Sequence, residues 1–188
     1  MKNRSLAPAI SGANLGTMNP LRLLAAAVAP IGIAIASVSA EPLDTGAALP
    51  AVTAKDQDGK EVKLAEEGAK GWTLVYFYPK ADTPGCTKQA CSLRDSYETM
   101  TDKGVRIYGT SMDTVEAQKA FKDKYKLPFT LLADKDAKVA DAFGVPHAAG
   151  FAKRQAFLFK DGKLVWRDLE ASTDQQAADV LKEVEKAR

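Results

Sequence analysis

The segment Trp72-Thr-Leu-Val-Tyr-Phe-Tyr78, followed directly by Pro79-Lys-Ala-Asp-Thr-Pro-Gly-Cys86, decides the fold of this chain. Its nearly continuous run of apolar and β-favouring residues predicts a strand that is buried on both faces. Pro79 ends this strand, because proline lacks the backbone N–H that a sheet requires. A strand buried on both faces is typical of an α/β sheet that helices cover on both sides.

The rest of residues 41–188 alternates between strand and helix signals, after a Pro-, Gly- and Ala-rich lead-in over 41–50 that we expect to be loose. Asp-Gly pairs, which tolerate positive φ, predict hairpins over 52–64 and 155–169. Further strands are expected at 105–110 and 129–132, and helices at 84–102, from Asp113 or Thr114 to 125, at 137–143, and from Ser172 or Thr173 onward. This order predicts one α/β domain, a sandwich with a mixed central sheet flanked by helices.

Composition narrows the function classes. Hydrophobic residues make up 46% and charged residues 27% of the 188 residues, which is ordinary for a globular protein. A formal net charge of +2 is far from the basic excess of a nucleic-acid-binding protein. Two cysteines and the single histidine, His147, are too few for a four-cysteine zinc site or a His-rich centre. We therefore expect no metal, no cofactor and no nucleic-acid partner.

Residues 1–40 have the layout of a secretory signal peptide. They contain no Asp or Glu, and residues 23–36 form an apolar stretch. Val38-Ser39-Ala40 places small residues before a cleavage site, and Met18 is an alternative start. The apolar stretch is shorter than the roughly 20 residues that span a membrane. We therefore expect cleavage at the end of this segment, a mature domain of residues 41–188 without membrane contact, and a periplasmic or otherwise exported protein; an uncleaved anchor is the alternative.

Cys86 follows the buried strand at the place where open α/β sheets bind their ligands. Thr83 is a suitable N-cap and Pro84 a suitable first helical residue, so Cys86 falls in the first turn of the helix. Backbone N–H groups in that turn lack intrahelical acceptors and can point at an anion. The sequence thus places a cysteine sulfur beside groups that favour negative charge.

A nucleophilic cysteine here requires a neighbouring cation. Only about 3% of a free thiol is thiolate at pH 7, and the thiolate is the nucleophile. A helix dipole contributes about 0.3–1 kcal/mol toward that charge. A cation about 4 Å away contributes about 4 kcal/mol at an effective dielectric of about 20. Arginine is preferred to lysine, because it stays charged and offers a planar fork to two acceptors.

Cys91 lies on the same expected helix, but on its polar face. Five helical steps give about 500° of rotation and about 7.5 Å of rise, hence a Cα separation near 8.6 Å. A disulfide rarely tolerates more than about 7 Å. The two cysteines can therefore bond only if the first turns of the helix unwind. A permanent structural bridge between Cys86 and Cys91 is the alternative.

The pattern Pro79-x-x-x-Thr83-x-x-Cys86 resembles the active-site motif of the peroxiredoxins. The longer string YFYPKADTPGCTKQACSLRD (76–95) is similar to the bacterioferritin comigratory protein, or Q-type, subfamily, in which a second cysteine lies five positions after the first. The resemblance extends over most of residues 50–188. It implies a thioredoxin-like sandwich, a monomer, and no cofactor or metal.

The same resemblance implies the site residues and the reaction. Cys86 is the peroxidatic cysteine, Cys91 the resolving cysteine, and Thr83 holds the peroxide. Pro79 shields the pocket, and Arg154 is the activating cation. The implied enzyme reduces hydrogen peroxide and organic hydroperoxides through a sulfenic acid, which an intramolecular disulfide resolves, and a thioredoxin-like protein reduces that disulfide.

Two other function classes fit the sequence less well. A periplasmic thiol–disulfide oxidoreductase of thioredoxin-like fold is the main alternative, but it is expected to carry Cys-x-x-Cys, whereas four residues separate Cys86 from Cys91 here. A copper-delivery protein is expected to have closer cysteines and a well-placed histidine. His147, between Pro146 and two alanines, is expected to be a loop residue.

Overall fold

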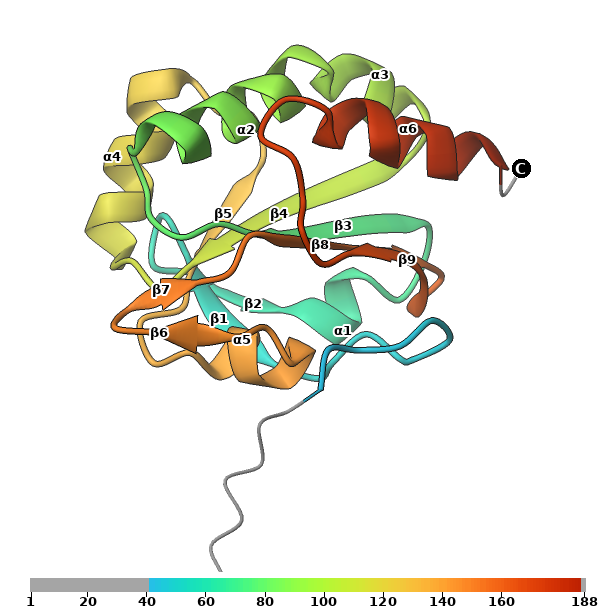
Figure 1. The fold of residues 1–188 in the computed structure, drawn as a ribbon, viewed down its shortest axis with the longest axis horizontal. Coiled ribbons are helices and arrows are strands. Elements are labelled where there is room, and N and C mark those ends of the chain that lie inside the picture. The colour runs from blue at the N-terminus through green and yellow to red at the C-terminus, as the bar shows by residue number, and fades with distance from the viewer. Residues whose placement is uncertain (1–40, 187–188) are drawn as a thin grey trace, which may run out of the picture. The chain divides into compact units, whose positions relative to one another are not determined.

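The computed structural model describes residues 41–186, which form a seven-stranded mixed sheet covered by helices (Figure 1). The strands are ordered β2-β1-β5-β4-β3-β8-β9. Their bounds are β1 Thr53–Asp56, β2 Glu61–Lys63, β3 Trp72–Phe77, β4 Val105–Ser111, β5 Thr130–Ala133, β8 Gln155–Lys160 and β9 Lys163–Asp168. A separate two-stranded ribbon pairs β6 His147–Ala148 with β7 Phe151–Ala152. The predicted α/β sandwich with a mixed sheet is confirmed.

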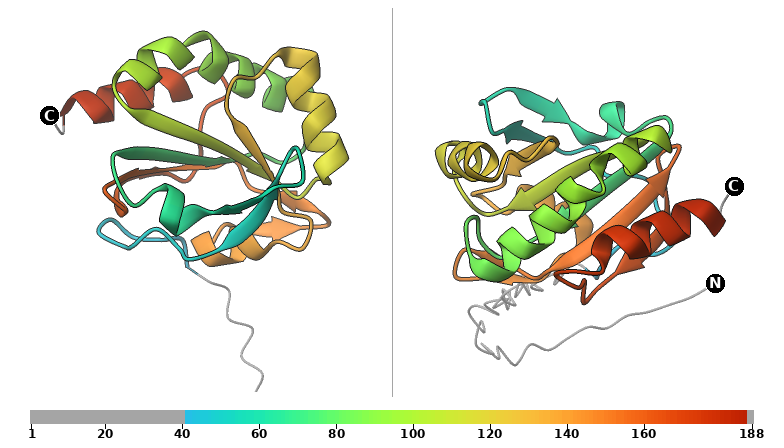
Figure 2. Two further views of the ribbon diagram at one scale, coloured as in Figure 1. Left: turned by 180° about the vertical axis from the view of Figure 1, so that it is seen from behind. Right: turned by 90° about the horizontal axis from the view of Figure 1, so that it is seen from above.

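The helices divide into two layers, one on each face of the sheet (Figure 1). They are α1 Leu64–Glu67, α2 Pro84–Asp95, α3 Tyr97–Asp102, α4 Val115–Tyr125, α5 Lys138–Phe143 and α6 Gln176–Lys186. Buried side chains of α2, α3, α4 and α6 share one hydrophobic cluster, while those of α1 and α5 share the other. Figure 2 shows α2 and α6 running side by side above the sheet.

Strand β3 lies inside the sheet and contributes side chains to both hydrophobic clusters. It pairs parallel with β4 and antiparallel with β8, and all six of its residues are buried. Because successive strand residues point to opposite faces, Leu74 and Tyr76 pack beneath α2 while Val75 and Phe77 pack toward α5. The prediction of a strand buried on both faces is confirmed.

The predicted helix over 84–102 is two helices. Ser96 has φ −101° and ψ 6°, outside the helical region, and separates α2 from α3. The last helix begins at Gln176, later than predicted, because the Ser172 hydroxyl accepts hydrogen bonds from the backbone N–H groups of Asp174 and Gln175 and forms a turn first. Thr114, one of the two predicted caps, accepts the N–H of Ala117. Helix α1 and the β6–β7 ribbon were not predicted.

The lead-in is not loose, contrary to the prediction. Gly46 N–H donates to the carbonyl of Leu164 on β9, and Arg167 donates to the carbonyls of Pro42 and Leu43. Leu43 N–H donates to Phe143 at the end of α5. Composition alone missed these bonds, because their partners lie about a hundred residues or more further along the chain.

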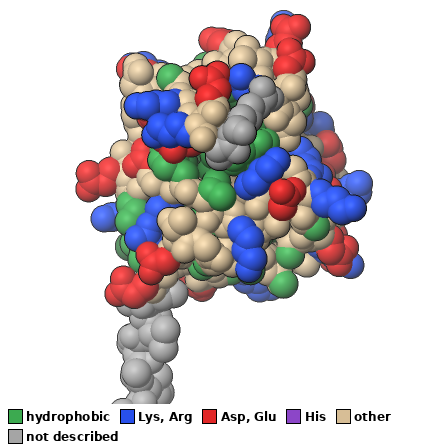
Figure 3. Space-filling view, turned by 90° about the vertical axis from the view of Figure 1, so that its right-hand side faces the viewer, with side chains coloured by type: hydrophobic (Ala, Val, Ile, Leu, Met, Phe, Trp, Pro, Cys, Tyr) green, Lys and Arg blue, Asp and Glu red, His purple; other side chains and the backbone are tan. Residues whose placement is uncertain are grey.

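The surface carries charges of both signs. On the face drawn in Figure 3, Lys and Arg side chains alternate with Asp and Glu side chains. This mixture agrees with the formal net charge of +2 for the whole sequence. Within residues 41–186, no helix is long and apolar enough to cross a membrane. The predicted signal peptide over residues 1–40 lies outside the described residues.

Gly144 ends α5 in a left-handed conformation, and the lead-in packs so closely against it that no side chain fits there. Its φ is +65°, and an added Cβ would lie 2.1 Å from the carbonyl oxygen of Glu41. Gly46, with φ +92°, has nothing within 4 Å of such a Cβ. Gly46→Ala is therefore expected to cost about 1–2 kcal/mol of conformational strain. Gly144→Ala is expected to cost roughly twice as much, because the lead-in must also shift.

Urea unfolding of both glycine variants measures this difference. Equal destabilisation of the two variants would show that the contact between residues 41 and 144 does not constrain the fold.

Candidate active site

Cys86 lies in the first turn of α2, just beyond the carboxyl end of β3. Thr83 is the N-cap residue, Pro84 the first helical residue and Cys86 the third, as the sequence predicts. The Cys86 side chain is 2% exposed, and its thiol is free. The Thr83 hydroxyl does not cap the helix; it donates to the carbonyl of Lys80 at 3.1 Å. The first-turn N–H groups of α2 therefore do not donate to the Thr83 hydroxyl.

Arg154 is brought to Cys86 by the register of two strands. Antiparallel pairing sets Phe77, the last residue of β3, opposite Gln155, the first residue of β8. Arg154 therefore sits directly beside the loop that leads to α2. Its Nη2 lies 3.5 Å from Cys86 Sγ, and its Nη1 donates to Oε1 of Gln89 one turn further along α2. At that distance an opposite charge on the sulfur would be attracted by about 4–5 kcal/mol at an effective dielectric of about 20, before desolvation.

The floor of the site is apolar apart from two phenols. Tyr76 and Tyr78 are fully buried in the cluster that contains Cys86. Desolvation by burial raises the pKa of both phenols well above the ordinary value of 10.0. Both rings are therefore neutral at physiological pH, and neither adds negative charge beside the sulfur. The Tyr78 hydroxyl donates to Gln118 of α4, whereas the Tyr76 hydroxyl has no partner among the described residues.

The loop over residues 79–83 is braced on two sides. Asp113, just before α4, accepts hydrogen bonds from the backbone N–H of Ala81 and from the Ser111 hydroxyl, both at 2.7 Å. Asp82 has a left-handed φ of +59° and accepts from Lys124 and Tyr125 at the end of α4. These hydrogen bonds lower the pKa of the Asp82 carboxyl, which is consequently ionised at neutral pH. The loop that precedes Cys86 is thus held by α4 as well as by β3.

Cys91 lies two turns into α2, is partly exposed, and also carries a free thiol. The spacing of apolar residues predicts Cys86 on the buried face of the helix and Cys91 on its polar face. The observed burial of the two side chains agrees with this prediction. In the structure, both cysteines belong to one unbroken helix, Pro84–Asp95. Helical geometry keeps them too far apart to bond in this conformation.

An apolar groove opens beside Arg154, on the side of the β6–β7 ribbon. Its volume is about 480 Å³. The lining residues are Pro79, Pro146, His147, Ala148, Phe151, Ala152, Lys153 and Arg154. Phe151 is 45% exposed and lines this groove, so the groove presents an apolar wall to solvent. His147 lies in this groove, on β6 rather than in a plain loop, and contacts Asp141 at 2.9 Å.

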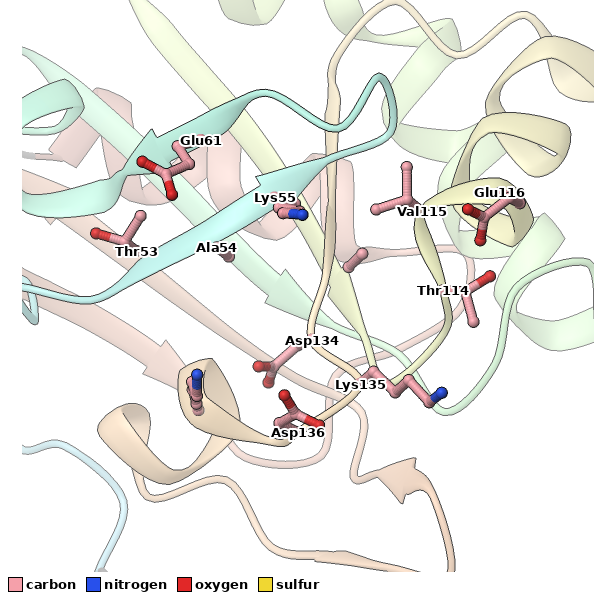
Figure 4. A pocket seen from close by; sticks show the side chains of 12 residues that line it. Thr53, Ala54, Lys55, Glu61, Thr114, Val115, Glu116, Asp134, Lys135 and Asp136 are labelled. Carbon is pink, nitrogen blue, oxygen red and sulfur yellow. The ribbon is translucent and has the colours of Figure 1, made fainter.

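A second depression, of about 490 Å³, is lined by β1, the start of α4 and the segment before α5 (Figure 4). Lysine and acidic side chains mix along its walls, among them Lys55, Glu116 and Lys135. None of the predicted site residues lines it. Because its lining residues have mixed charges and include no cysteine, we do not relate this depression to the chemistry expected of Cys86.

Comparison with known proteins identifies the family. The model of the AhpC/TSA family matches residues 45–167. The chain belongs to the AhpC/TSA family. Among AhpC/TSA relatives, "Peroxiredoxin Q, chloroplastic" of Suaeda salsa is 54% identical over 101 residues, which are 54% of this chain and 47% of that protein. The chain thus matches about half of the length of this curated relative.

Solved structures of similar proteins share the fold. Peroxidoxin BcpB from Mycobacterium tuberculosis is 31% identical with a TM-score of 0.73, covering 78% of this chain and 99% of that one. The bacterioferritin comigratory protein of Xanthomonas campestris is 25% identical with a TM-score of 0.69, covering 79% and 99%. The predicted Q-type resemblance and the thioredoxin-like sandwich are both confirmed.

The predicted periplasmic or otherwise exported location is wrong for this AhpC/TSA protein. The relatives from Suaeda salsa, Sedum lineare and Populus jackii are named as chloroplastic proteins. The prediction rested on residues 1–40, which lie outside the described residues. A positively charged segment without acidic residues is common to secretory signals and to organelle transit peptides, so this pattern does not separate the two.

Of the five predicted residues, the structure brings Arg154, just before β8, into contact with Cys86. Pro79 and Thr83 lie on the loop before α2, and Pro79 lines the groove together with Arg154. Cys91 lies further along α2, away from this contact. Sequence reasoning missed three residues around them. These are Gln89, which binds Arg154, Gln176, which binds Gln89, and Asp113, which holds the loop. Only Gln89 had a usable signal, because it lies one turn after Cys86 on the same face of the helix.

The Asp113 brace is expected to matter for Cys86. Asp113→Ala leaves the N–H of Ala81 without its acceptor, which is expected to cost about 1–3 kcal/mol of unfolding free energy. We also expect slower alkylation of Cys86 by iodoacetamide at pH 7, because a looser loop weakens the contact with Arg154 that favours the reactive thiolate. Asp82→Asn is the matched control on the other side of the loop. Its partners are exposed, and exposed ion pairs contribute little. Equal rates for Asp113→Ala and the parent protein would contradict this role.

Proposed function

We propose that the chain is a thiol-dependent peroxidase in which Cys86 is the peroxidatic cysteine. The observation that carries the proposal is the Arg154 guanidinium, 3.5 Å from a buried free thiol in the first turn of a helix. Cation, helix terminus and burial all favour a reactive thiolate over an inert core cysteine. The relatives named peroxiredoxin Q support the same activity.

The first half of the reaction oxidises Cys86. The thiolate attacks one oxygen of the peroxide, an S–O bond forms and the O–O bond breaks. The leaving hydroxide or alkoxide takes up a proton, which yields water or an alcohol, and Cys86 becomes a sulfenic acid. Arg154 and the first-turn N–H groups stabilise the charge that develops on the two oxygens. The Thr83 hydroxyl donates its hydrogen to the backbone carbonyl of Lys80. Its oxygen is therefore available to accept a hydrogen bond from the O–H of the peroxide.

The second half regenerates the thiol. Cys91 attacks the sulfenic sulfur, an intramolecular disulfide forms and water leaves. Because both cysteines lie on α2, the turns between them must unwind first. A dithiol protein of the thioredoxin type then reduces the disulfide by thiol–disulfide exchange. We propose that the chain acts as a monomer, since the resolving cysteine is on the same helix and no second copy is required for this step.

Organic hydroperoxides are proposed as substrates together with hydrogen peroxide. The apolar groove begins at Arg154 and Pro79, so a peroxide group placed at Cys86 would have its organic substituent directed along Phe151. Pro79 forms part of this wall, and we propose that it shields the sulfur from solvent on that side. The Xanthomonas campestris relative is described as having alkyl peroxide reduction activity, which supports this substrate class.

The alternative of a thiol–disulfide oxidoreductase is less well supported. Such an enzyme presents its attacking sulfur to a protein disulfide, whereas Cys86 is 2% exposed. Reduction of insulin by the chain faster than its consumption of peroxide would favour the alternative.

Two cysteine variants test the reaction. Cys86→Ser is expected to abolish peroxide consumption in the presence of dithiothreitol, because the attacking sulfur is gone. Cys91→Ser is expected to consume one equivalent of peroxide per chain when no outside thiol is supplied, because the sulfenic acid then has no partner. Intact mass after one equivalent of peroxide reports the products: a loss of two hydrogens in the parent protein, and a gain of one oxygen in Cys91→Ser. Full turnover by Cys86→Ser would refute the proposal.

Phe151 tests the groove. Phe151→Ala is expected to lower kcat/KM for a long-chain organic hydroperoxide about ten-fold, the effect of losing about 1.4 kcal/mol of apolar contact. Hydrogen peroxide, which has no organic substituent, is expected to react as before. Val165→Ala is the matched control, because Val165 is an exposed apolar residue of β9 that does not line the groove. An equal fall for both peroxides would show that Phe151 supports the fold rather than the substrate.

A further inference from the structure

A line of buried polar side chains leads from Cys86 to the start of α6. Arg154 contacts Cys86 Sγ with one guanidinium nitrogen and Gln89 with another. The amide nitrogen of Gln89 donates to Oε1 of Gln176, the first residue of α6. Both glutamines are 0% exposed. The amide nitrogen of Gln176 has no hydrogen-bond partner among the described residues, so the line ends there.

The direction of each hydrogen bond in this line is fixed. A guanidinium can only donate, so Gln89 must present its oxygen to Arg154. The amide nitrogen of Gln89 then faces α6, and only an acceptor at residue 176 satisfies it. Without that acceptor, the amide nitrogen of Gln89 has no partner, because the guanidinium on its other side cannot accept a hydrogen bond. Gln89 then loses one of the two hydrogen bonds that fix its side chain, and its oxygen is held less firmly against Arg154.

From this geometry we propose that Gln176 is a positioning residue for the reaction at Cys86. Its amide oxygen fixes the orientation of Gln89, which in turn holds the Arg154 guanidinium against the sulfur. The proposal rests on the proposed function for its chemical meaning, but the placement of Arg154 can be tested without any peroxide. The unpartnered amide nitrogen of the buried Gln176 side chain lowers the free energy of unfolding. The positioning role accounts for the presence of a glutamine here in spite of that cost.

Other contacts hold the same two segments together. Lys88 pairs with Asp174 at 2.8 Å, and the Ser92 hydroxyl donates to the Asp174 carbonyl at 3.3 Å. These contacts are exposed and can dock α6 without Gln176. Removal of the Gln176 amide is therefore expected to change the orientation of Gln89 more than the position of α6.

The test uses iodoacetamide as a probe of Cys86 in the Cys91→Ser background, where Cys86 is the single remaining thiol. The titratable groups that face Cys86 are Arg154, Tyr76 and Tyr78, and both phenols stay neutral over the range used, about pH 5–9. The pH at which the alkylation rate is half-maximal then reports how well Arg154 stabilises the thiolate. The rate of one turnover with hydrogen peroxide is measured alongside.

Gln176→Met removes the acceptor and keeps the volume. We expect the half-maximal pH of alkylation to rise by about one unit and the peroxide rate at pH 7 to fall about ten-fold. Gln176→Glu keeps an acceptor oxygen in the same place and loses no hydrogen bond, since the nitrogen that it replaces makes none. Because position 176 is 0% exposed, burial keeps this carboxyl neutral, so that it adds no negative charge near the sulfur. This variant is expected to restore both values to near those of the parent. Gln175→Met, at the exposed neighbouring position, is the matched control and is expected to change neither.

Three results would overturn the positioning role. The first is an unchanged half-maximal pH in Gln176→Met, even if that variant is slower, because a structural defect alone would slow it. The second is an equal defect in Gln176→Met and Gln176→Glu. The third is a similar shift in Gln175→Met. If the parent protein consumes peroxide no faster than Cys86→Ser, the proposed function fails, whereas the alkylation series still decides the role of Gln176.

Discussion

The contact between the Arg154 guanidinium and Cys86 Sγ is the interaction on which the proposed chemistry of this protein depends. Three features of the fold converge to make it. The buried strand β3 ends at Phe77, α2 begins after the loop at Pro84, two residues before Cys86, and antiparallel pairing brings Arg154 to the same edge. Because both strands are fixed inside the sheet, the cation and the sulfur are held together by the backbone register rather than by flexible side chains alone.

Local rules were sufficient to place the sulfur but not its surroundings. The buried strand, the proline that follows it, the N-cap at Thr83 and the position of Cys86 in the helix all follow from neighbouring residues. Arg154 lies 68 residues from Cys86, and only the family resemblance pointed to it. Gln176 is 87 residues from Gln89 and Asp113 is 32 from Ala81, so no spacing in the sequence reveals those bonds.

The remaining differences have the same origin. The lead-in was predicted to be loose because it is rich in Pro, Gly and Ala, but backbone hydrogen bonds to β9 and α5 order it. The β6–β7 ribbon has only two residues in each strand, too few for alternation to be recognised, although it forms a wall of the groove beside Arg154. The exported location was inferred from a leader-like pattern that different targeting routes share, and the comparisons contradicted it.

The break at Ser96 separates α2 from α3, and buried residues on either side of it are firmly anchored in the core. Leu93 and Met100, on either side of it, are completely buried and anchor the end of α2 and the body of α3 in the core. The end of α2 that carries Cys86 is linked to α6 partly by exposed contacts. In the proposed reaction, loss of helical order at that end can therefore stop before Ser96, so that each cycle disturbs a few backbone hydrogen bonds while Leu93 and Met100 stay in the core.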